Sequence, residues 1–162
     1  MALETLLLLR IEIRSLNLDR RILTVENLSI KIPLSEGILN AVDNISIHVD
    51  RGETLAIVGE SGCGKSLTSL AIMNLLPQRA KREVNTLKLK DKNILGLSEK
   101  EMSNIRGNQI GMIFQEPMTS LNPSFSVENQ MKEVLIRHKN LSQDKARKLV
   151  IEMLEKVGVV PE

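Results

Sequence analysis

The stretch Gly59-Glu60-Ser61-Gly62-Cys63-Gly64-Lys65-Ser66 decides the fold of this chain. It fits the pattern G-x-x-x-x-G-K-[ST], in which glycines let the backbone curl until successive N–H groups point inward at an anion. The lysine of this pattern reaches the β and γ phosphates of a nucleotide, and the hydroxyl after it ligates Mg²⁺. The predicted nucleotide-binding residues are Gly59, Glu60, Ser61, Gly62, Cys63, Gly64, Lys65, Ser66 and Leu67.

The segments on either side of this phosphate loop supply the context that the motif requires. Within residues 54–58 the last four (Leu-Ala-Ile-Val) are continuously apolar, which is typical of a strand buried on both faces of a parallel sheet. After the loop, apolar residues recur at helical spacing until Pro77. The order strand, glycine loop, helix therefore favours a phosphate site. The alternative is a glycine turn without a ligand, in which Lys65 is simply solvated.

Hydrophobic periodicity predicts the remaining elements. Alternation over residues 22–32 and 45–49 indicates two strands, and residues 109–114 are expected to form a further strand. Helices are predicted from the capping box at Ser98 and Glu101 and from apolar stripes over 127–135 and 146–157. Residues 1–21 fit either a leader or an extra strand, so the domain is expected to span 22–162.

Composition narrows the classes of function. The 162 residues are enough for one domain, and their only aromatic side chains are Phe114 and Phe125. Single-strand nucleic-acid binders need stacking platforms, and a net charge of +2 gives no basic stripe, so no nucleic-acid partner is expected. The single cysteine, Cys63, excludes an internal disulfide. The apolar run 6–9 is too short to insert into a membrane.

A broader resemblance rests on two stretches, residues 52–66 and 113–123 (Ile-Phe-Gln-Glu-Pro-Met-Thr-Ser-Leu-Asn-Pro). With them, residues 22–162 resemble the N-terminal part of the ATP-binding subunits of ABC transporters, most closely of oligopeptide, dipeptide and nickel importers. The resemblance implies an α/β P-loop NTPase fold with an antiparallel β portion and the start of a helical subdomain. It also implies ATP and Mg²⁺ as cofactors, ATP hydrolysis, and a peripheral place on the cytoplasmic face of the membrane. The partners that it implies are transmembrane permease subunits and a second ATP-binding subunit.

Gln115 matches the glutamine of the Q-loop in that family. The resemblance implies that its amide ligates Mg²⁺ or orients the attacking water, so Ser66 and Gln115 are the expected metal ligands. A surface glutamine in a turn is the alternative. Glu116 is expected to contact the loop or a partner rather than act as a catalytic base.

The sequence also departs from the family pattern. No Ser-Gly-Gly signature occurs, and no apolar run is followed by Asp-Glu, the Walker B arrangement that would supply a magnesium ligand and a catalytic base. Hydrolysis by these 162 residues alone is therefore not expected, and a truncated, non-hydrolysing nucleotide-binding fragment is an alternative. Another P-loop kinase or GTPase is disfavoured, because no Asn-Lys-x-Asp occurs. Ile32 stands where the family usually stacks adenine on an aromatic ring.

Overall fold

A computed structural model describes residues 20–115 and 120–159. The chain divides into two compact units. The first unit comprises Met1–Lys65 and Arg79–Leu95, and the second comprises Ser66–Gln78 and Gly96–Glu162. The predicted leader or extra strand lies almost wholly outside the described residues, so that prediction and the domain boundary at residue 22 are not tested.

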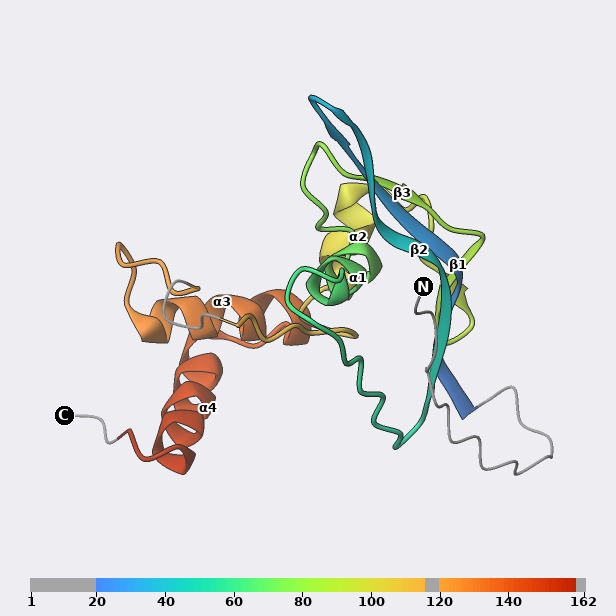
Figure 1. Cartoon of the computed structure of the whole chain (residues 1–162). Helices are drawn as coiled ribbons and strands as arrows, with labels where there is room; N and C mark the ends of the chain where they lie inside the picture. The colour runs from blue at the N-terminus through green and yellow to red at the C-terminus, as the bar shows by residue number, and fades with distance from the viewer. Residues whose placement is uncertain (1–19, 116–119, 160–162) are drawn as a thin grey trace. The chain divides into compact units, whose positions relative to one another are not determined.

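The first unit is built on a long antiparallel hairpin (Figure 1). Strand β1 (Arg21–Leu34) pairs with β2 (Gly37–Asp50), as the alternating pattern predicts. Polar and apolar residues alternate because one face of each strand packs inward while the other meets solvent. The hairpin is longer than the pattern suggests, since β2 already begins at Gly37 and contains polar positions.

Two asparagines shift the register of this hairpin. Asn27 and Asn44 both adopt left-handed backbone conformations, with φ of 56° and 48°. Each donates its backbone N–H to a serine hydroxyl of the opposite strand: Asn27 to Ser46 Oγ and Asn44 to Ser29 Oγ, both at 2.9 Å. These side chains take over hydrogen bonds that the ladder loses where the register changes between Val25 and Ile30.

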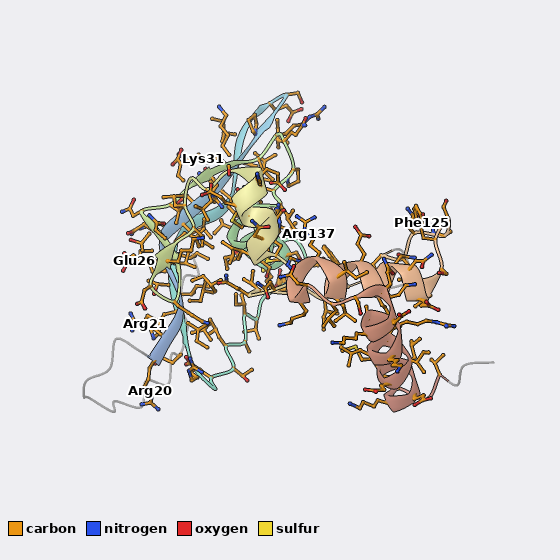
Figure 2. All side chains as sticks on the ribbon, turned by 180° about the vertical axis from the view of Figure 1, so that it is seen from behind. Arg20, Arg21, Glu26, Lys31, Phe125 and Arg137 are labelled. Carbon is orange, nitrogen blue, oxygen red and sulfur yellow. The ribbon has the colours of Figure 1, made fainter. Side chains whose placement is uncertain are left out.

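Three short strands complete an antiparallel sheet. They are β3 (Lys81–Glu83), β4 (Thr86–Leu89) and β5 (Lys92–Asn93). The order is β2-β1-β4-β5, with β3 also paired to β1. Lys31 on β1, labelled in Figure 2, binds Glu83 on β3 with Nζ 2.7 Å from Oε2. The core of the unit is aliphatic, as the composition predicts: Val25, Leu28, Ile30, Val42, Leu87, Leu89 and Ile94 are buried.

The second unit is helical. Its helices are α1 (Lys65–Ile72), α2 (Glu99–Ile105), α3 (Val127–Lys139) and α4 (Gln143–Lys156), with Lys65 itself assigned to the first unit. The predicted capping box is present, since the Ser98 hydroxyl accepts from Glu101 N–H and the Glu101 carboxylate accepts from Ser98 N–H. Ser126 and Ser142 are the N-cap residues of α3 and α4, and the hydroxyl of each accepts a hydrogen bond from the backbone N–H three residues later. All four predicted helices are present, but the first ends at Ile72 and not at Pro77 as predicted, because the chain closes into a turn at Asn74.

The two predicted buried strands, residues 54–58 and 109–114, are wrong for this structure. Neither segment is a strand, and Val58 and Ile113 are 83% and 95% exposed. A strand exists only where a neighbour pairs with its N–H and C=O groups. Within the described ranges every pairing between strands is antiparallel and belongs to the first unit, and the one parallel bridge, Arg106 with Ile110, is isolated, so neither segment has a neighbouring strand. Both segments have the apolar pattern of buried strands, but no strand of the described residues pairs with them.

Candidate nucleotide-binding site

The phosphate loop, residues 59–66, curls through left-handed glycines. Gly62 and Gly64 have φ of 84° and 89°, a region that other L-residues rarely occupy. The curl brings the Lys65 ammonium back over the loop, where Nζ donates to the Gly59 carbonyl at 2.8 Å and to the Glu60 carbonyl at 2.6 Å. A cation therefore lies inside the bend in which the motif predicts phosphate.

The loop approaches β2 so closely that only glycine fits at position 64. A Cβ added there would lie 2.4 Å from the Ala41 carbonyl oxygen and 2.8 Å from Val42 Cγ2. A Cβ on Gly59 would lie 2.6 Å from Cys63 Sγ, across the bend. Gly64 thus lets the loop lie against β2, Gly59 leaves the space across the bend free of its own side chain, and the residues present fit a phosphate group. The contact of Gly64 with β2 was not predicted, because nothing in the local sequence identifies the neighbour.

Helix α1 begins at Lys65, so Ser66 and Leu67 belong to its first turn. The first N–H groups of a helix have no partner within it and carry positive partial charge, which favours an anion. No acidic side chain in that turn competes for this position. The Ser66 hydroxyl is exposed and available to a metal ion, while Leu67 is half-buried.

The other candidate residues do not gather into a catalytic cluster in the described part of the chain. Gln115 belongs to the second unit and is exposed, so its role toward Mg²⁺ or water stays a prediction. Glu116 lies outside the described residues. Across residues 20–115 and 120–159, no group of three or more His, Cys, Asp or Glu side chains is arranged to hold a metal ion. The groups predicted to hold Mg²⁺ therefore remain the Ser66 hydroxyl and the Gln115 amide.

A pocket of the second unit lies along α3 and the segment that precedes it. It has a volume of about 670 Å³ and is lined by Phe125, Lys132, Glu133 and Arg137, among others. Phe125 and Arg137 lie near opposite ends of α3 (Figure 2). Glu128 connects α3 and α4 by pairing with Lys132 at 2.8 Å and Arg147 at 3.5 Å. The hydrogen bond from Lys132 is the main reason why the pKa of Glu128 is lowered.

None of the helices in the described ranges is both long and apolar enough to cross a bilayer.

The family model described as "ABC transporter" matches residues 42–161, which is most of the chain. The chain belongs to the ABC transporter family. The match includes β2 from Val42 onward, the phosphate loop, Gln115 and all four helices. The expectation drawn from residues 52–66 and 113–123 is therefore confirmed at the level of the family.

Curated relatives in this ABC family carry transport names. The oligopeptide transport ATP-binding protein OppD of Bacillus subtilis is 49% identical over 142 residues, covering 86% of this chain and 39% of OppD. The dipeptide transport ATP-binding protein DppD of the same organism is 49% identical over 140 residues, covering 86% of this chain and 42% of DppD. The chain thus spans about two fifths of the length of these relatives.

Solved ABC cassettes share the fold. The dimeric ATP-binding cassette MJ0796, in a post-hydrolysis state bound to ADP and Pi, superposes with a TM-score of 0.70 at 24% identity. The alignment covers 83% of this chain and 56% of that protein. The predicted fold class, the N-terminal part of an ABC ATPase with an antiparallel β portion, is confirmed.

Proposed function

We propose that this ABC chain is the nucleotide-binding part of an ATP-binding subunit that energises peptide import, with MgATP held at residues 59–66. The observation that carries the proposal is the position of the Lys65 ammonium inside the glycine bend. The names of the relatives, which specify oligopeptide and dipeptide transport, support the choice of solute class.

Each part of the loop has a distinct task in this proposal. The backbone N–H groups of the bend and of the first turn of α1 bind phosphate oxygens. Lys65 exchanges its bonds to the Gly59 and Glu60 carbonyls for bonds to the β and γ phosphates. Bound Mg²⁺ would neutralise phosphate charge, and the Ser66 hydroxyl would hold it, with Gln115 as a second ligand or as the group that orients water.

Partners follow from the same proposal. A transport ATPase must act on a membrane protein, so we assign this chain to the cytoplasmic face, bound to transmembrane permease subunits. A second ATP-binding subunit completes the assembly, and the dimeric cassette MJ0796 supports this part of the proposal by fold alone.

A nucleotide-binding fragment without turnover is the second candidate. It is favoured by a specific observation: the 162 residues contain neither Ser-Gly-Gly nor Asp-Glu. The two candidates make the same prediction for binding and differ only in hydrolysis, which requires groups that these residues do not supply.

The proposal is tested by comparing triphosphate with monophosphate. Isothermal titration of the chain with ATP in the presence of Mg²⁺ should give saturable binding, whereas AMP should bind at least about tenfold more weakly, because it lacks the phosphates that Lys65 contacts. Removing Mg²⁺ with EDTA should weaken ATP binding. Equal affinities for ATP and AMP would show that residues 59–66 are not a phosphate site.

A variant expected to gain affinity tests where the adenine of ATP lies. Ile32 is half-buried and pairs with Leu39 across the hairpin, so the surface at this position is aliphatic. Ile32→Tyr should raise the affinity for MgATP about fivefold, which corresponds to about 1 kcal/mol, the lower end of base stacking on a ring. The control His48→Tyr adds the same ring at an exposed position of β2 and should have no effect. A gain from both variants would contradict the placement of adenine at Ile32.

A further inference from the structure

Helix α1 ends in a closed turn. Asn74 is left-handed with φ of 56°, and its N–H donates to the Ala71 carbonyl at 3.2 Å. The next N–H, that of Leu75, donates to the Leu70 carbonyl at 2.8 Å. This pair of bonds is the Schellman arrangement, which satisfies carbonyls within the helix but leaves those of the turn itself pointing outward.

One arginine binds the carbonyls that remain. The Arg106 guanidinium donates from Nη1 to the Met73 carbonyl at 3.2 Å and to the Asn74 carbonyl at 3.5 Å. Its Nη2 forms an ion pair with Glu99 of α2. The Arg106 side chain is only 15% exposed, while Glu99 is 74% exposed. A largely buried cation therefore lies at the end of α1 where the helix dipole is negative.

Arg106 also belongs to a tight turn at the end of α2. Its backbone forms an isolated bridge with Ile110, and Gly107 N–H donates to the Ile110 carbonyl at 2.9 Å. The Ile105 carbonyl accepts from the N–H groups of residues 108–110. This turn, residues 105–110, is the last hydrogen-bonded structure before the exposed segment that leads to Gln115.

The length of α1 makes these contacts important. It has eight residues, whereas isolated helices shorter than about 12 to 15 residues are barely stable in water. The N-terminal turn that would bind phosphate therefore depends on contacts made elsewhere along the helix. At the opposite end, Arg106 supplies two hydrogen bonds and a favourable charge.

We propose that Arg106 is a positioning residue that ties the C-terminal end of α1 to the turn preceding Gln115, so that nucleotide bound at the N-terminal end of α1 steadies residues 105–110. This inference rests on the proposed nucleotide function. Phosphate binding reduces fraying of α1, and a helix that does not fray keeps the Met73 and Asn74 carbonyls in place for Arg106. Lysine is a poor substitute, because a single ammonium lacks the planar fork that reaches two carbonyls and a carboxylate together.

Amide hydrogen exchange of the whole chain, with and without saturating MgATP, tests the link. In the wild type, MgATP should slow exchange over residues 105–110 by about twofold to fivefold, the range of one helix-terminus charge interaction. In Arg106→Met this nucleotide-dependent slowing should vanish even at saturation. Arg106→Lys, the milder variant, should retain part of it.

The matched control is Arg137→Met, because Arg137 binds α2 from α3, through Ser103 Oγ, and not from the turn after α2. It should keep the full slowing. A purely structural role for Arg106 would speed exchange equally with and without nucleotide, and persistence of the slowing in Arg106→Met and Arg106→Lys would overturn the proposal. So would a wild type that binds MgATP with no change over residues 105–110. Absence of any MgATP binding by the wild type would instead overturn the nucleotide function, and this inference with it.

Discussion

Lys65→Ala should lower the affinity for MgATP by about tenfold to hundredfold. Hydrogen bonds to charged groups contribute about 1.5 to 3 kcal/mol each, and about 1.4 kcal/mol corresponds to a factor of ten. The ammonium lies 2.8 Å from the Gly59 carbonyl and 2.6 Å from the Glu60 carbonyl, so it can transfer to phosphate with little rearrangement of the loop. Isothermal titration calorimetry measures the change.

The control for this variant is Lys88→Ala. Lys88 is an exposed lysine of β4 in the same unit, so its removal changes the net charge equally without touching the loop. Its affinity for MgATP should match that of the wild type, and circular dichroism should show both variants folded. Equal affinity of Lys65→Ala and the wild type would contradict the assignment of the phosphate loop.

Gly64→Ala should destabilise the first unit by about 2 to 5 kcal/mol and abolish measurable ATP binding. A left-handed backbone costs an L-residue about 1 to 2 kcal/mol, and forcing extra atoms into a packed site adds about 1 to 3 kcal/mol. The packing cost applies because the new Cβ would lie 2.4 Å from the Ala41 carbonyl oxygen, which is a backbone atom and cannot rotate away. Urea unfolding gives the change in free energy.

Gly96→Ala separates the cost of the left-handed backbone from the cost of the steric clash. Gly96 has φ of 77°, but a Cβ there would meet nothing within 4 Å. Its destabilisation should therefore be limited to the backbone term of about 1 to 2 kcal/mol, and ATP binding should be retained. If both variants lost the same free energy, the close approach of the loop to β2 would be disproved.

Local patterns predicted most of the elements correctly. The helices at Ser98, Ser126 and Ser142 begin where a hydroxyl side chain can cap them, and this signal lies within a few residues of the sequence. The hairpin of β1 and β2 follows from alternation, and the phosphate loop from its motif. Each of these features is determined by neighbours in the chain.

Features that depend on distant partners were missed. Residues 54–58 and 109–114 have the pattern of buried strands, but a strand also needs a neighbour, and no strand of the described residues pairs with either segment. The contacts of Arg106 were not predicted, because its partners, the Met73 and Asn74 carbonyls, are backbone atoms that no side-chain pattern reveals. The register shift at Asn27 could not be predicted either, because it depends on which residues of β2 lie opposite.

Cys63 has a practical consequence for anyone who handles this protein. It is the only cysteine of the 162 residues, it is exposed, and its sulfur lies 3.5 Å from the Lys65 ammonium. Every maleimide dye or spin label therefore attaches inside the phosphate loop, at a place where the bulk of the label fills the cradle. Spectroscopic probes intended to watch nucleotide arrive must be carried by a cysteine introduced elsewhere, in a Cys63→Ser background.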